Sequence, residues 1–320
     1  MAEVLGKSIR DFETCNTARL RRDPAFAKLY GRPPSALRRR SRSGETADPR
    51  RGIALMPRAQ TGGAKMSQAE KARAFADLHR PGDPLLLYNI WDAGGAKAIA
   101  EAGAKAVATG SWSVAAAQGY PDGQAIPLDL VLTIVARIAA TVDVPVTLDF
   151  EGGYAEAPED LAANLARVIA AGAVGINFED QVVGGAGLHP VAAQGERIAA
   201  LRAAAETAGL PFFLNARTDL FLKEKDRGRH GDLAAGAIER AAAYAEAGAS
   251  GFFVPGLVDP DLIGAICEAA SLPVNVMMLD GAPSTEALAS LGVARISHGP
   301  GPYFTAMKGL AARFRKAAGG

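Results

Sequence analysis

The sequence predicts an α/β protein of the (β/α)8 TIM-barrel type, because short apolar runs alternate with helical stretches along most of its length. Three of the helical stretches end in the same tripeptide, Ala-Gly-Ala, directly before an apolar run. A glycine just past the end of a helix closes it and lets a strand begin at once. Eight apolar runs over about 250 residues match the eight strands of a barrel.

The expected strands follow an opening helix at about 67–78. They are Leu85–Asn89, Ala104–Thr109, Val144–Asp149, Val174–Glu179, Pro211–Asn215, Gly251–Val254, Pro273–Val276 and Ala294–Ser297. A doubly wound open sheet is the alternative architecture. It is disfavoured because the first strand is followed by Tyr88-Asn89-Ile90-Trp91-Asp92 and not by a glycine-rich nucleotide-binding turn.

Residues 1–65 differ in composition from the rest of the chain. They hold 15 Lys/Arg and 6 Asp/Glu, whereas residues 66–320 hold 20 and 28, and they show little periodic apolar pattern. We expect a disordered basic leader over 1–65 and a barrel domain over 66–320. Because clean helical patterning begins at Met66, we hypothesise that the functional protein starts near that residue.

The composition indicates in which compartment the protein works and which classes of partner it binds. The two cysteines, Cys15 and Cys267, support neither a disulfide framework nor a cysteine-rich metal site, so we expect a cytoplasmic protein. The absence of an apolar run near the roughly 20 residues of a membrane span argues against a membrane protein. The basic excess is confined to the leader, which argues against nucleic acid as the main partner.

Two neighbouring strands end in carboxylates. Asp149 and Glu151 follow one strand, Glu179 and Asp180 follow the next, and an amphipathic helix at about 158–171 joins them. Parallel strands in such a unit end at the same edge, so the acids should lie together. Clustered oxygen ligands suit a hard cation such as Mg²⁺, with Mn²⁺ as a substitute. The alternative is that acids simply follow strands often.

Other strand ends also present polar groups. In Gly110-Ser111-Trp112, backbone N–H groups and a hydroxyl could bind a carboxylate or phosphate, or Ser111 could simply cap a helix. Arg217 could clamp a carboxylate bidentately or pair with a nearby acid such as Asp219. Asp122 could be a turn former. The charged run from Lys223 to His230 is expected to be solvated.

Four motifs together resemble the isocitrate lyase/phosphoenolpyruvate mutase superfamily, over residues from about 67 to 310. They are Gly119-Tyr-Pro-Asp, Asp149-Phe-Glu-Gly-Gly-Tyr, Glu179-Asp-Gln and Asn215-Ala-Arg-Thr-Asp. The resemblance implies a modified (β/α)8 barrel that binds Mg²⁺ and acts on α-oxo acids or related dicarboxylates through an enolate-like intermediate. It also implies a C-terminal helix exchanged between subunits and a homodimer or homotetramer.

The resemblance further assigns roles to single residues. Asp149 is implied as the metal-binding acid, with Glu151 and Glu179 holding the metal partly through water. Gly110, Ser111 and Trp112 lie on the loop implied to receive the substrate, and Asp122 and Arg217 are implied as catalytic, Arg217 also binding the substrate's anionic group. Asn275, at the end of the seventh strand, is a further expected substrate-binding residue.

The segment after the second acid pair departs from the family pattern. The lyases carry a loop with a proton-donating cysteine there, whereas this chain has Gln181-Val-Val-Gly-Gly-Ala-Gly, and the Lys and Asn of the mutase branch are missing too. We therefore expect an Mg²⁺-dependent lyase that cleaves a C–C bond of a small α-oxo or 2-hydroxy carboxylate, by retro-aldol cleavage or decarboxylation. A phosphonopyruvate-type mutase or hydrolase, and a non-catalytic oxo-acid binder, are the alternatives.

Overall fold

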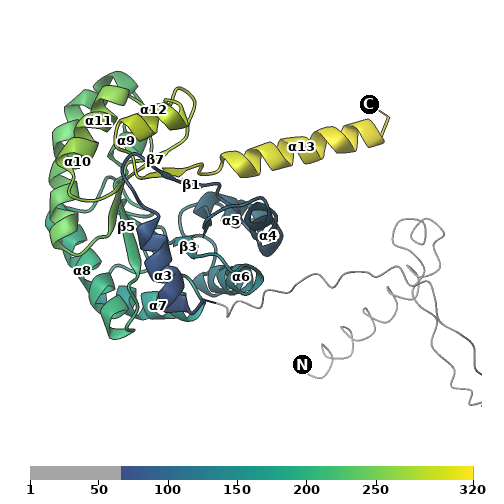
Figure 1. Ribbon diagram of the computed structural model, residues 1–320, viewed down its shortest axis with the longest axis horizontal. Coiled ribbons are helices and arrows are strands. Elements are labelled where there is room, and N and C mark those ends of the chain that lie inside the picture. Colours follow the sequence, from purple (N-terminus) through teal and green to yellow (C-terminus); the bar gives the residue numbers. More distant parts are fainter. Residues whose placement is uncertain (1–65, 320) are drawn as a thin grey trace, which may run out of the picture. The chain divides into compact units, whose positions relative to one another are not determined.

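A computed structural model describes residues 66–319, so the predictions for the leader at 1–65 lie outside the described residues. The described part forms one sheet of eight parallel strands in the order β1-β8-β7-β6-β5-β4-β3-β2 (Figure 1). The strands are β1 (Leu85–Leu87), β2 (Val107–Ala108), β3 (Val146–Asp149), β4 (Gly175–Glu179), β5 (Phe213–Arg217), β6 (Gly251–Phe253), β7 (Val274–Met277) and β8 (Arg295–Ser297).

The sheet closes on itself where its two outermost strands meet. Just past β1 and β2, Ile90 and Thr109 form a parallel bridge, and the Ile90 N–H donates to the Ala108 carbonyl at 2.9 Å. The result is a (β/α)8 barrel, which confirms the predicted fold class and rules out the open sheet. Each of the eight predicted strands is confirmed, with bounds shifted by a few residues.

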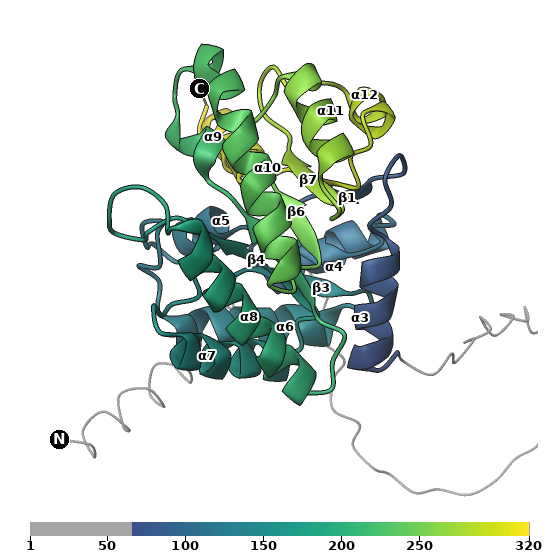
Figure 2. The same ribbon diagram turned by 90° about the vertical axis from the view of Figure 1, so that its left-hand side faces the viewer.

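Helices surround the barrel (Figures 1 and 2). They are α3 (Gln68–Asp77), α4 (Ala93–Glu101), α5 (Ser111–Ala117), α6 (Leu128–Thr141), α7 (Pro158–Ala170), α8 (Val191–Thr207), α9 (Leu220–Lys223), the 3₁₀ turn η1 (Arg227–Arg229), α10 (His230–Glu246), α11 (Pro260–Ala269), α12 (Thr285–Ser290) and α13 (Gly301–Ala317). Helices α6, α7 and α11 each bury one apolar face, as their sequence periodicity predicts.

The opening helix α3 covers the amino-terminal end of the barrel. Its Phe75 ring packs edge-on against Phe213 of β5, with ring centroids 5.4 Å apart. Gly175 of β4 leaves room for this ring, because a Cβ there would lie 3.0 Å from Phe75. With this end blocked by packed side chains, the groups that can meet a ligand lie at the carboxyl ends of the strands.

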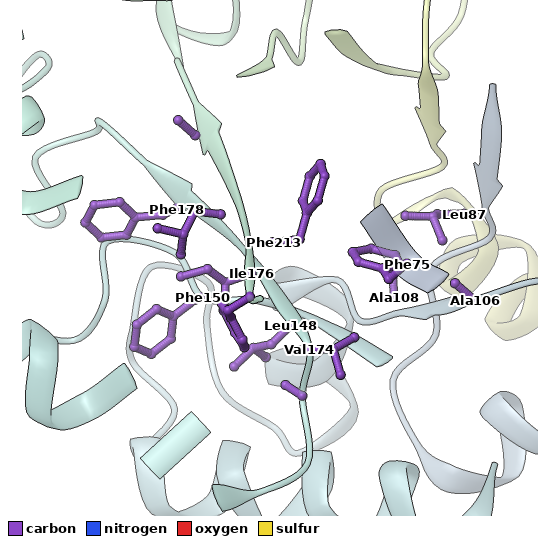
Figure 3. Close-up of a cluster of buried hydrophobic side chains, with 14 of the residues drawn as sticks. Phe75, Leu87, Ala106, Ala108, Leu148, Phe150, Val174, Ile176, Phe178 and Phe213 are labelled. Carbon is purple, nitrogen blue, oxygen red and sulfur yellow. The ribbon is translucent and has the colours of Figure 1, made fainter. Parts of the chain in front are cut away.

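The core is a continuous set of buried apolar side chains from the strands and the surrounding helices. Figure 3 shows part of it, where Leu148 of β3 and Ile176 of β4 lie side by side as their register requires. Such a close-packed interior holds the strand ends in fixed positions. The polar groups at those ends are therefore presented on a rigid frame.

The last helix, α13, runs away from the barrel (Figure 1). It exposes a stripe of large apolar side chains at helical spacing, Phe304, Met307, Leu310 and Phe314. None of the helices in residues 66–319 is long and apolar enough to cross a membrane.

Candidate active site

A cavity of about 530 Å³ opens at the carboxyl ends of the strands. Its polar lining comes from several strands and from the loops that follow them. The acids that line it within residues 66–319 are Asp122, Asp149, Glu151, Glu179 and Asp219, and the cations are Arg217, Lys223 and Lys225. The cavity therefore collects more negative than positive charge.

Asp149, at the end of β3, is held by the start of helix α5. The backbone N–H and hydroxyl of Ser111 donate to Oδ2 of Asp149 at 3.0 and 2.9 Å. The other oxygen, Oδ1, is buried and accepts no hydrogen bond from residues 66–319. Ser111 therefore orients the carboxylate and leaves one oxygen available to a cation.

Glu151 occupies a strained position in the turn after β3. Its backbone φ is +51°, a conformation that non-glycine residues adopt rarely and mostly where a site requires it. The Gln124 N–H donates to Oε2 at 2.7 Å, and the Tyr154 hydroxyl donates to Oε1 at 3.1 Å. Burial, followed by the nearby Asp149 charge, raises the pKa of Glu151 to about 7.

Arg217, at the end of β5, connects the acids. Its Nη1 lies 3.1 Å from Oε2 of Glu179 and 3.9 Å from Oδ1 of Asp149. Its Nε and Nη2 donate to the two carboxylate oxygens of Asp219 at 2.6 and 3.0 Å. Burial, together with the Asp219 and Asp149 charges, outweighs Arg217 and raises the pKa of Glu179 to about 8.

These groups fit a divalent cation. Asp149 offers a buried oxygen that has no hydrogen-bond partner in the described chain. Glu151 and Glu179 line the same cavity, where burial and the neighbouring acids raise their pKa values. Nowhere in the described chain do three or more Asp, Glu, His or Cys side chains stand close enough to hold a metal directly. Mg²⁺ keeps several waters and binds through one or two carboxylates, so the free oxygen of Asp149 is the donor that fits it.

Of the other predicted site residues, three line the cavity and one does not. Gly110, Trp112 and Asp122 line the same cavity, and burial followed by the Asp149 charge raises the pKa of Asp122. The structure does not bring Asn275 to the cavity lining, since its buried amide pairs with the Ser297 hydroxyl at 3.3 Å.

Sequence reasoning missed several lining residues. Lys223 and Lys225 line the cavity with exposed side chains. His230, at the end of the charged run that begins at Lys223, is buried beside Phe221, which makes its predicted solvation wrong. Asn177, in the middle of β4, lines the cavity floor between Asp149 and the barrel interior. A charged run after a strand end could have indicated the lysines, whereas nothing local indicated Asn177.

A comparison with protein-family models matches residues 75–318 to the phosphoenolpyruvate phosphomutase model. The chain belongs to the isocitrate lyase/phosphoenolpyruvate mutase superfamily. Members of this superfamily are enzymes, lyases and mutases that act on oxo acids. The residues that suggested the resemblance are the ones that surround the cavity, Asp122, Asp149, Glu151, Glu179 and Arg217.

Three relatives illustrate the range of the superfamily. The 2-methylisocitrate lyase of Escherichia coli K12 is 31% identical over 241 residues, covering 72% of this chain and 78% of the relative. A Burkholderia cenocepacia J2315 protein, provisionally assigned as a phosphonomutase, is 49% identical, with a TM-score of 0.76 over 78% of this chain and 100% of that one. A phosphonopyruvate hydrolase complexed with oxalate and Mg²⁺ shares the fold at 22% identity, with a TM-score of 0.67 over 78% of this chain and 88% of that one.

The buried Glu179 makes a testable prediction about pH. Because its pKa is about 8 in the folded protein and near 4.5 when exposed, the folded state binds the extra proton between these values. In a chelating buffer, the unfolding free energy of the wild type should therefore fall from pH 5 to pH 8 relative to that of Glu179→Gln. Denaturant unfolding of both proteins at several pH values measures the difference, and parallel curves would contradict the assignment.

Proposed function

We propose that the chain is an Mg²⁺-dependent carbon–carbon lyase that cleaves an α-oxo or 2-hydroxy carboxylate by retro-aldol cleavage or decarboxylation. The observation that supports this function best is that Asp149, Glu151 and Glu179 line one cavity, where Oδ1 of Asp149 accepts no hydrogen bond from the described residues. The superfamily to which the chain belongs acts on oxo acids, and a distant member is complexed with Mg²⁺ and oxalate.

In this proposal Asp149 holds the cation directly, and Glu151 and Glu179 hold it through water. When bound there, Mg²⁺ supplies Lewis-acid polarisation of the substrate's oxo group. Ser111 keeps Asp149 in position through its two hydrogen bonds, and this fixed arrangement avoids reorganisation during the reaction.

Asp122 is the group that we assign to move a proton at the carbon released by bond cleavage. It lines the cavity, and burial followed by the Asp149 charge raises the pKa of its carboxyl group. Arg217 is already paired with Asp219 and Glu179, so its main part in the proposal is to hold the acids in place. Its contact with a substrate would require one of these pairs to loosen.

A panel of oxo and hydroxy acids, followed by detection of pyruvate, tests the function. We expect turnover that needs Mg²⁺. The turnover rate should fall at least about 1,000-fold in Asp149→Asn, because the cation is lost. It should fall about 100- to 10,000-fold in Asp122→Asn, because acid catalysis is lost. Asp129→Asn, an exposed position on α6, is the matched control with unchanged rate. Turnover that is indifferent to Mg²⁺ or to Asp149→Asn would contradict the proposal.

A phosphonate mutase or hydrolase is the second candidate function. The 49% identity to a protein provisionally assigned as a phosphonomutase favours it. The same panel distinguishes the two reactions, because phosphonopyruvate would then yield inorganic phosphate or phosphoenolpyruvate while the carboxylic acids are inert. Binding of oxalate with Mg²⁺ but no turnover of any member would indicate a non-catalytic oxo-acid binder.

Lys223 and Lys225 are the cations on the cavity wall that make no ion pair with an acid in the described chain. We expect them to attract a second anionic group of the substrate. Lys223→Met and Lys225→Met should each raise KM for a dianionic substrate about 3- to 10-fold, the modest range for exposed charges. Lys97→Met on α4 is the matched control, and steady-state kinetics in low and high salt measure the effect. Equal KM values in all three variants would exclude this role.

We also propose that copies of the chain associate through α13 as a homodimer or homotetramer. The exposed apolar stripe of Leu310 and Phe314 supports this, as do the exposed side chains of Leu86 on β1 and of Tyr88 just after it. Light scattering should find an oligomer for the wild type and a monomer for Leu310→Glu/Phe314→Glu. Lys316→Glu, on the opposite face of the same helix, should stay oligomeric, and a monomeric wild type would refute the association.

A further inference from the structure

Arg295 is the largest fully buried side chain in the described barrel, and it crosses the barrel interior. It lies on β8, and its Nη2 donates to the side-chain oxygen Oδ1 of Asn177 on β4 at 2.9 Å. Because β8 and β4 are not neighbours in the sheet, this hydrogen bond spans the inside of the barrel. It ends directly beneath the cavity, since Asn177 is a lining residue.

A cation in this position destabilises the folded state. The Nε and Nη1 atoms of Arg295 are buried and have no hydrogen-bond partner in the described chain. Burial lowers the pKa of Arg295 to about 9, which still leaves the side chain charged at neutral pH. An apolar side chain of similar volume generally stabilises such a site better than an incompletely paired charge. This cost to stability points to a functional role for Arg295 through the residue that it contacts, Asn177.

The contact fixes the orientation of the Asn177 amide. An arginine only donates hydrogen bonds, so the group that faces it must be the amide oxygen and not the amide nitrogen. Asn215 on β5 donates its Nδ2 to the same oxygen at 2.9 Å. The assignment of oxygen and nitrogen in Asn177 thus follows from its partners, where an amide is otherwise ambiguous. Its two N–H donors must point away from Arg295.

Away from Arg295 lies the cavity. Asn177 is the register partner of Asp149 across β3 and β4, so the two side chains point to the same side of the sheet at the same level. Both side-chain hydrogen bonds of Asn177 in the described residues end on its oxygen. The amide nitrogen is left to meet whatever occupies the cavity floor beside Asp149.

We propose that Asn177 is a substrate-binding residue whose amide N–H donates to an anionic oxygen of the oxo acid, and that Arg295 is the positioning residue that keeps this donor turned toward the cavity. The inference rests on the proposed function for the presence of an oxo-acid ligand. It adds a neutral donor on the side of the ligand that faces the barrel interior. Such a fixed donor stabilises negative charge on oxygen without reorganising when the charge forms.

Calorimetric titration of the full chain with oxalate in the presence of Mg²⁺ tests the proposal. We expect Asn177→Ala to weaken oxalate binding about 10- to 100-fold, the range for one hydrogen bond to a charged group. Gln68→Ala is the matched control, because it removes an amide that donates to the Ile169 and Ala173 carbonyls and does not line the cavity, and it should weaken binding less than about twofold. Equal losses in the two variants, or no loss in Asn177→Ala, would overturn the inference.

A double-mutant comparison tests the positioning role of Arg295. Arg295→Met should weaken oxalate binding in the wild-type background but not in the Asn177→Ala background, because the donor that it orients is then already gone. A structural effect would weaken binding equally in both backgrounds and would overturn the role of Arg295. Failure of the wild type to bind oxalate with Mg²⁺ would instead overturn the proposed function and this inference with it.

Discussion

The site depends on the group of carboxylates that surrounds the guanidinium of Arg217. Arg217 contacts Glu179, Asp219 and, at longer distance, Asp149, and it leaves the acids with more negative than positive charge around them. Burial is the main reason why the pKa values of Glu151 and Glu179 are raised, and the neighbouring acid charges add to it. A divalent cation bound among these acids would reduce their mutual repulsion, which is the basis of the proposed metal-dependent chemistry.

The fold could be predicted from the sequence because its signals are local. The three Ala-Gly-Ala helix ends are confirmed, with Gly103, Gly172 and Gly248 at φ values of +99°, +97° and +96°. Each apolar run that follows such an end forms a strand of the buried sheet, because burial removes its apolar side chains from water. The direction of α13 could not be predicted in this way, because the same amphipathic sequence can pack on its own barrel or on a partner's.

The site was predictable in part. Asp149, Glu151 and Glu179 follow adjacent strands and line one cavity, as expected. Asp180 was expected to join them, but its buried carboxylate pairs with Arg240 and Tyr244 instead. The pairing of Asn177 with Arg295 could not be predicted, since the two residues are 118 positions apart and meet across the barrel. The solvation predicted for the run after β5 was wrong for His230, because the helix that begins there turns its first residue inward.

The central claim is that Asp149 and its neighbouring acids bind one divalent cation, and direct titration of the metal tests it without knowledge of the substrate. Electron paramagnetic resonance of Mn²⁺, which replaces Mg²⁺ at oxygen ligands, counts bound ions per chain. The account predicts one bound Mn²⁺ per chain that Mg²⁺ displaces and that Asp149→Asn loses. Absence of bound Mn²⁺, or binding that is equally tight in Asp149→Asn, would contradict it.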